Sequence, residues 1–145
     1  MKVEGSFWDA VAGRSPGPPG TALLGWKVRD IDAEAGTITV EFDGKSDFSN
    51  PTGAIQGGYL AAMLDDTMGP CLYAMLEPGH FAPTVELKIN YIRPAQPGKL
   101  IGEGRVVHKG RSLAFLAGEL KTEEGQLVAT GTATARIVKI SNEQG

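Results

Sequence analysis

The sequence predicts an α+β domain in which a curved antiparallel sheet of five to six strands wraps around one long central helix. Three observations indicate this. Residues 57–76 are the only stretch long enough, with a helical apolar pattern, to form a long helix, whereas several segments after residue 83 alternate apolar and polar residues. The length of 145 residues and the 41% hydrophobic content suffice for one core. Curling the sheet around the single helix covers its apolar face.

The first 20 residues are predicted to form a short helix at 6–12 and a loop at 14–20, because proline and glycine break regular structure there. The folded domain is expected to span residues 21–140. It would begin with a strand at 21–29 and end in a flexible tail at 141–145.

Alternation with a period of two predicts the remaining strands. Residues 37–42 follow a turn at 32–36, and in residues 84–91 the apolar side chains share one face. A turn at 94–98 separates these from a predicted meander of three further strands, at 100–108, 113–121 and 127–138.

The helix at 57–76 would be about 30 Å long at 1.5 Å per residue, and its broad apolar surface predicts that it is buried. Pro70 cannot donate to the carbonyl of Asp66, so we expect a kink or weakened hydrogen bonding there.

The start of this helix and its acids point to chemistry. Gly57 and Gly58 open the helix, and a helix N-terminus offers unpaired N–H groups that can hold a developing negative charge. Asp65 and Asp66 lie within the apolar stretch, where a carboxylate is costly to bury unless it takes part in a reaction. Together these features suggest acyl transfer.

Composition argues against several classes of function. A net charge of −3 without a run of Lys or Arg gives no footprint for nucleic acid. No apolar stretch approaches the roughly 20 residues of a membrane span, and no signal-peptide core is present, so a soluble cytoplasmic protein is expected. With Cys71 as the only cysteine and His80 and His108 as the only histidines, neither a disulfide nor a metal site is expected.

Several pieces of the chain occur together in a familiar order: Asn50, the glycine pair after Gln56, Asp65, residues 84–95 and residues 109–114. In order and spacing they resemble the hotdog-fold acyl-CoA thioesterases of the phenylacetic-acid-degradation type, over roughly residues 24–138. The resemblance implies hydrolysis of a thioester to a free acid and coenzyme A. Coenzyme A enters as part of the substrate, and no further cofactor is required.

The resemblance also implies a role for each matched residue. Gly57 would donate its backbone N–H to the thioester carbonyl oxygen. Asp65 would act as a general base or as a nucleophile, and the sequence leaves both routes open. Asn50 would lie beside the nucleophile or the thioester, and Thr84 would hydrogen-bond the carboxylate or its water. Gln56 stands where the family usually has histidine, so it can hold geometry but cannot carry charge.

Binding residues follow from the same comparison. The segment near the pantetheine and phosphates would contain Gly110, Arg111 and Ser112, with Arg93 as another basic candidate, because a guanidinium binds two phosphate oxygens at once. The acyl group would contact Tyr59, Met63 and Phe81. Aryl, short-chain and medium-chain acids all remain open.

Helix geometry adds an inference about assembly. Gly57 and Asp65 are eight residues apart and therefore about 12 Å apart along a helix, whereas both groups must come within ~3 Å of one carbonyl. A two-fold homodimer in which Gly57 of one subunit faces Asp65 of the other resolves this. The family has this arrangement, commonly as dimers of dimers, so a homodimer or homotetramer is expected.

Two other functions stay open. A catalytically silent module that binds acyl-CoA as a sensor or carrier would suit Gln56 in the histidine position. A dehydratase of the same fold fits less well, because those enzymes rely on a histidine and neither histidine lies near the helix start. Without the resemblance, Asp65 and Asp66 would be read as solvent-facing helical acids.

Overall fold

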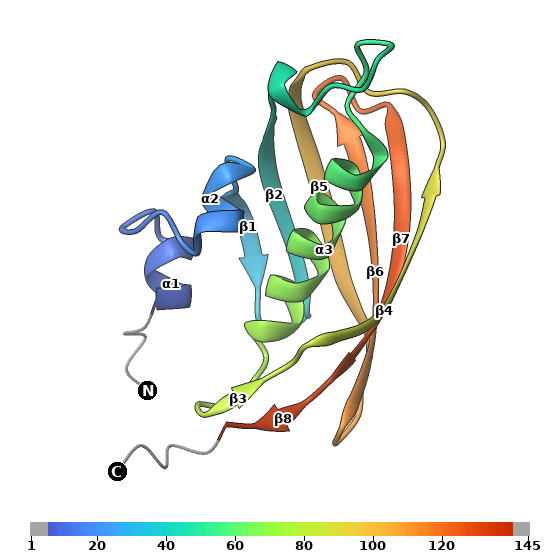
Figure 1. Cartoon of the computed structure of the whole chain (residues 1–145). Coiled ribbons are helices and arrows are strands. Elements are labelled where there is room, and N and C mark those ends of the chain that lie inside the picture. The colour runs from blue at the N-terminus through green and yellow to red at the C-terminus, as the bar shows by residue number, and fades with distance from the viewer. Residues whose placement is uncertain (1–5, 141–145) are drawn as a thin grey trace.

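A computed structural model of the chain describes residues 6–140, and its centre is one long helix, α3 (Gly57–Tyr73), against a curved antiparallel sheet (Figure 1). The sheet has six strands in the order β1-β2-β5-β6-β7-β4. The predicted α+β architecture is therefore confirmed. Its strands are β1 (Lys27–Asp32), β2 (Thr37–Gly44), β4 (Thr84–Tyr91), β5 (Gly98–Lys109), β6 (Leu113–Thr122) and β7 (Leu127–Arg136).

Strand order differs from chain order at two places. β5, β6 and β7 form the predicted meander, whereas β2 pairs with β5 and β4 pairs with β7. A separate two-stranded ribbon joins β3 (His80–Phe81) to β8 (Val138–Lys139), and a 3₁₀ turn, η1 (Ser46–Phe48), precedes the loop that leads into α3.

The N-terminal region contains a correction. Instead of a strand at 21–29, the chain forms α1 (Ser6–Val11), a loop, and then α2 (Pro19–Leu23), with β1 beginning only at Lys27. Pro19 suits the first turn of a helix because its fixed φ is helical and its missing N–H needs no partner there. The expectation that residues 14–20 are only loop is wrong at its end. The predicted tail at 141–145 lies outside the described residues.

The core lies between α3 and the sheet, as the apolar pattern of the helix predicts. The helix is slightly shorter than expected, since it ends at Tyr73, and Pro70 lies inside it. Its buried residues are Leu60, Met63, Leu64, Thr67, Met68, Cys71 and Leu72. Inward side chains of the sheet, such as Val40, Phe42, Leu116 and Leu120, complete this core.

Glycines in the sheet let the helix approach closely. Gly104, Gly118 and Gly131 lie directly opposite one another on β5, β6 and β7. A methyl group at Gly118 would lie 3.0 Å from Met68, and one at Gly102 would overlap the hydroxyl of Thr67. Thr67 is fully buried, and its hydroxyl donates to the Met63 carbonyl at 2.8 Å. The row of missing side chains therefore sets the spacing between helix and sheet.

The two edges of the sheet have opposite character. At the β4 edge, Val85, Leu87 and Tyr91 are 58%, 36% and 54% exposed, and no other described strand pairs with that edge. At the far edge, β1 alternates two half-buried apolar residues with exposed charged ones: Lys27, Arg29, Asp30 and Asp32. An open apolar edge is a template for pairing with another chain, and a charged edge is not.

A methyl group added at Gly102 and one added at a second, exposed glycine should change the free energy of unfolding in opposite directions. Gly102→Ala should lower the free energy of unfolding by about 1–3 kcal/mol, because overpacking pushes α3 from the sheet. Gly58→Ala should raise it by about 0.5 kcal/mol, because this exposed position in the first turn of α3 has nothing within 4 Å of the added group and alanine loses less backbone entropy on folding. Urea denaturation at one protein concentration measures both, and equal effects would contradict this account of the helix spacing.

Candidate functional site

The N-terminus of α3 is built to leave backbone N–H groups free. The preceding residue, Gln56, is extended at φ −62 and ψ 139, and its side chain makes no capping hydrogen bond. The Tyr91 hydroxyl donates to the Gly57 carbonyl at 2.8 Å, and a Cβ at Gly57 would lie 3.0–3.1 Å from the Tyr91 ring. Only glycine fits beneath Tyr91 without displacing it, so the first helical N–H stays sterically open.

A tight loop delivers the chain to this helix start. The side-chain oxygen of Asn50 accepts hydrogen bonds from the backbone N–H of Thr52 at 2.9 Å and from its hydroxyl at 2.6 Å. The Gln56 N–H donates to the Phe48 carbonyl at 2.8 Å. Asn50 therefore shapes the loop through its oxygen, and among the described residues its amide nitrogen donates no hydrogen bond.

Halfway along α3 lies the second part of the candidate site. The hydroxyl of Thr84, the first residue of β4, donates to Oδ1 of Asp65 at 2.9 Å. Asp65 is only half buried, so its second carboxylate oxygen remains available. The structure thus brings Asp65 and Thr84 together, and the hydrogen bond fixes the orientation of the carboxylate.

A neighbouring acid is held by the N-terminal region. Because Pro70 has no N–H, the backbone carbonyl of Asp66 lacks its helical donor, and the indole Nε1–H of Trp26 donates to it instead at 2.9 Å. Burial raises the pKa of the Asp66 carboxyl, a hydrogen bond from Thr21 lowers it, and the charge of Asp65 raises it again. Together these effects raise the pKa of Asp66 above its ordinary value.

Both acids line one cavity of about 530 Å³. Its walls come from three places: the N-terminal region, the second half of α3, and the segment that runs from β3 into β4. Four aromatic side chains contribute to it: Phe7, Trp26, Tyr73 and Phe81. Among the described residues that line the cavity, Asp65 and Asp66 are the only ionisable acids and none is Lys, Arg or His.

The other predicted acyl-pocket residues lie elsewhere in this chain. Of the three, only Phe81 lines the cavity at Asp65. Met63 is fully buried in the core, and Tyr59 stacks on Phe48 with ring centroids 4.4 Å apart. Gly57 does not line the cavity either, so one chain separates the helix start from the acid.

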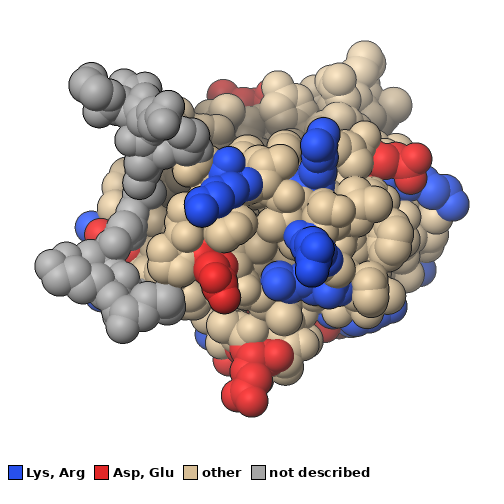
Figure 2. Space-filling model, turned by 90° about the horizontal axis from the view of Figure 1, so that it is seen from below, with Lys and Arg blue, Asp and Glu red and all other residues tan. Residues whose placement is uncertain are grey.

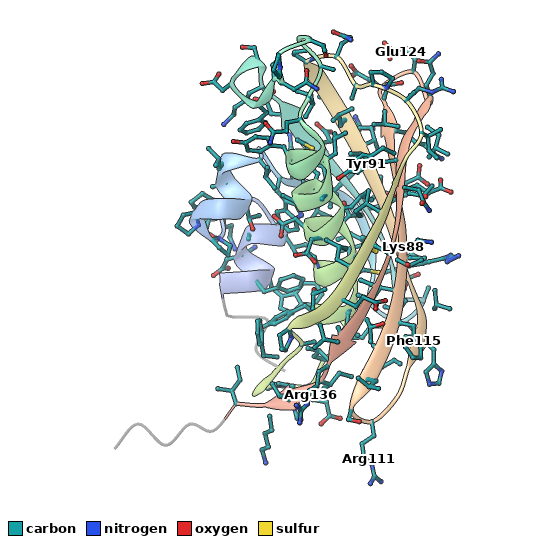
Figure 3. All side chains as sticks on the ribbon, turned by 45° about the vertical axis from the view of Figure 1, so that its right-hand side comes forward. Lys88, Tyr91, Arg111, Phe115, Glu124 and Arg136 are labelled. Atoms are coloured by element: carbon teal, nitrogen blue, oxygen red, sulfur yellow. The ribbon has the colours of Figure 1, made fainter. Side chains whose placement is uncertain are left out.

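The predicted phosphate-binding residues occupy opposite ends of the sheet. Gly110, Arg111 and Ser112 form the turn between β5 and β6, where the Ser112 carbonyl accepts from Ile137 at the end of β7. The Arg93 N–H instead donates to Val128, near the start of β7. Figure 3 shows Arg111 at the far end of the sheet from Tyr91, pointing away from the body of the molecule.

More basic residues gather at the Arg111 end than the sequence suggested. Lys109 lies in the same hairpin, Arg136 is paired with Leu113 across β6 and β7, and Lys139 lies on β8, all with exposed side chains. Seen from below, this end shows a group of Lys and Arg side chains over its middle (Figure 2). It is a suitable surface for phosphate.

Sequence reasoning missed the N-terminal contribution to the cavity. Trp26 and Asp66 are 40 positions apart, so no local pattern connects them. One signal was available: Pro70 deprives the carbonyl of Asp66 of its donor, and a buried carbonyl needs a partner from elsewhere. A tryptophan indole is a donor without acceptor capacity and suits that role.

Neither a metal site nor a membrane span is found in the part of the chain that the structure describes. No group of three His, Cys, Asp or Glu side chains there is placed to hold a metal ion. Each helix within residues 6–140 is too short or too polar to cross a bilayer.

Comparisons with known proteins agree with this architecture. The family model for the Thioesterase superfamily matches residues 52–129, a range that includes the start of α3, Asp65 and Thr84. A phenylacetic acid degradation-related protein from Ralstonia eutropha JMP134 has a solved structure with a TM-score of 0.85 and 39% identity, over 91% of this chain and 99% of that one.

Curated relatives match over most of their length. A candidate esterase from Saccharolobus solfataricus is 30% identical over 77% of this chain and 79% of its own. Human acyl-coenzyme A thioesterase 13 is 26% identical over 77% of this chain and 80% of its own.

The raised pKa of Asp66 predicts how stability changes with pH. The unfolded state loses the Asp66 proton near the ordinary pKa of 3.8, whereas the folded state keeps it to a higher pH. The free energy of unfolding therefore falls as pH rises from 3.8 through the pKa of the folded state. Asp66→Asn removes this loss. The free energy of unfolding of the variant minus that of the native protein should therefore be larger at pH 7 than at pH 3, as urea denaturation would show. A constant or shrinking difference would contradict the direction of the shift.

Proposed function

This chain belongs to the thioesterase superfamily and has its hotdog fold, and we propose that it hydrolyses an acyl-CoA thioester with Asp65 and the Gly57 amide at the reaction centre. The observation that supports the proposal is that β4 makes a hydrogen bond to both residues. Its first residue, Thr84, hydrogen-bonds Asp65, and its last, Tyr91, hydrogen-bonds Gly57. Human acyl-coenzyme A thioesterase 13, a relative by sequence, supports the substrate class.

In this reaction Asp65 activates the attack. One carboxylate oxygen is held by Thr84, which leaves the other free to take a proton from water or to attack the carbonyl carbon itself. The Gly57 N–H, at the positive end of α3, stabilises the oxyanion that forms. Collapse breaks the C–S bond, and coenzyme A leaves as a thiolate that takes up a proton. On the water route this step gives the free acid directly, whereas on the nucleophilic route it leaves a mixed anhydride with Asp65, which a water molecule then hydrolyses to the free acid. Both routes for Asp65 remain part of the proposal.

Gly57 and Asp65 act across a two-fold axis. They are about 12 Å apart along the same helix, too far to serve one carbonyl. If two β4 strands pair antiparallel at their open edges, the Tyr91 end of one lies against the Thr84 end of the other. Because each end carries one of the two groups, this pairing brings Gly57 of one subunit towards Asp65 of its partner.

The side chains of β4 suit this self-pairing. With the axis at Leu87, Glu86 of one strand lies opposite Lys88 of the other, which places opposite charges directly across the pair. The exposed Val85, Leu87 and Tyr91 would then be covered by the partner subunit. A closed pair also removes the apolar edge that the single chain leaves open.

The same pairing gathers the basic residues. Arg93 follows the end of β4 closely and β3 precedes its start, so this antiparallel pairing brings Arg93 of the partner subunit towards the β3–β8 ribbon of the first. Arg111, Arg136 and Lys139 lie at that end. We place the phosphates of coenzyme A there, where guanidinium groups can each bind two oxygens.

Gln56 is the residue that favours the rival function, a silent module that binds acyl-CoA. As N-cap of α3 it holds the helix start, but it brings no positive charge to a departing thiolate. Location in the cytoplasm and a dimer of dimers stay predictions of the sequence.

Removing the acid should abolish turnover. Asp65→Asn should lower kcat/KM by about 10²–10⁴-fold, the span for losing a positioned acid or base. Free-thiol release from a panel of acyl-CoAs measures it. Asp30→Asn, an exposed acid on β1, serves as the matched control and should retain native rates. Binding of acyl-CoA by the native protein without thiol release would favour the silent module.

Mixing two inactive variants tests the shared site. Any side chain at position 57 presses on the Tyr91 ring, so Gly57→Ala, which keeps the N–H, serves as the control for that displacement. The mixture combines Asp65→Asn, which removes the acid, with Gly57→Pro, which removes the N–H at the first helical position. A heterodimer of the two keeps one intact site, so co-refolded mixtures should regain about one quarter of native activity. Each variant alone should stay inactive. No recovery in a mixture that forms heterodimers would show that the two groups do not act across subunits.

A further inference from the structure

The cavity beside Asp65 has an unbalanced charge. Asp65 and Asp66 both line it, and no described Lys, Arg or His accompanies them there. The basic residues of this region lie instead in the β5–β6 hairpin and on β7 and β8. A substrate that spans both regions therefore meets positive charge at one end and negative charge at the other.

Asp66 is fixed in the cavity by its surroundings. Its backbone is anchored by the Trp26 indole because Pro70 supplies no N–H, and its carboxyl takes a hydrogen bond from Thr21. Both partners belong to the N-terminal region, which closes one side of the cavity. The acid cannot swing into bulk water without losing the Thr21 contact. Its carboxyl group is thus a fixed part of the cavity wall, negatively charged at pH values above its raised pKa.

The acyl group is the part of the substrate that enters this cavity. The walls carry Phe7, Trp26, Tyr73 and Phe81, which suit an apolar group. The reacting carbonyl must lie beside Asp65, and the phosphates belong with the basic residues outside the cavity. An acyl chain extending inward from the carbonyl passes Asp66, on the neighbouring position of the helix.

We propose that Asp66 is a specificity-determining residue that restricts the cavity to uncharged acyl groups and rejects acyl groups ending in a carboxylate. This inference rests on the proposed thioesterase function. A substrate carboxylate in a partly buried cavity that already holds two acids meets repulsion that water screens only weakly, and no described cation offsets it. Rejection of a competing substrate by like charge is a recognised source of specificity.

Matched substrates isolate this effect. Hexanoyl-CoA and adipyl-CoA differ in a terminal methyl or carboxylate, and phenylacetyl-CoA and 4-carboxyphenylacetyl-CoA form an aromatic pair. For each pair, the ratio of the two kcat/KM values cancels the shared chemistry at Asp65. The native protein should favour the uncharged member by about 100-fold or more, in line with the cost of like-charge contacts. Asp66→Asn should reduce this ratio by about tenfold or more.

The controls separate charge from structure. Asp30→Asn should leave the ratio unchanged, and Asp66→Ser gives a second uncharged variant should Asp66→Asn not fold. A purely structural role of Asp66 would change both members of a pair equally and leave their ratio as in the native protein, which would overturn the inference. Equal native rates on both members would also overturn it while leaving the thioesterase function intact. No thiol release from any acyl-CoA would overturn both.

Discussion

The close approach of α3 to the sheet is the constraint on which the rest of the structure depends. Gly104, Gly118 and Gly131 lie in one row across three strands and leave no side chain between the helix and their backbones. The helix therefore lies near enough to the edge strand for Tyr91 and Thr84 to reach it. A helix held further out would break both hydrogen bonds, and with them the orientation of the proposed catalytic groups.

The N-terminal region depends on a different constraint, the proline within α3. Pro70 withholds the donor that the Asp66 carbonyl needs, and Trp26 supplies it from a segment that precedes the sheet. Phe7 also reaches the helix, where its ring lies 4.7 Å from that of Tyr73. The N-terminal region thus attaches to α3 at the carbonyl that lacks its helical hydrogen bond. The same region forms one wall of the cavity that holds both acids.

Much of the fold follows from periodicity, because alternation along β2, β4 and β6 and the apolar surface of α3 reflect local burial. Strand order does not follow, since alternation says which face of a strand is buried but not its neighbour. The N-terminal error arose at Pro19, which breaks a helix interior but starts a helix well. Asp65 and Gly57 were predicted by resemblance, whereas the contact of Trp26 with Asp66 joins positions too distant for any local pattern.

The charged β1 edge limits how many chains could join by pairing the edge strands of their sheets. If both edges were apolar, each chain could add one neighbour on either side, and the result would be an endless sheet. The β1 edge is a poor acceptor because of Lys27, Arg29, Asp30 and Asp32, so of the two edges of the described six-stranded sheet only the β4 edge suits pairing. In the proposed dimer, pairing two β4 edges would leave neither of them open, so the assembly would stop at two chains and would not extend into a fibre.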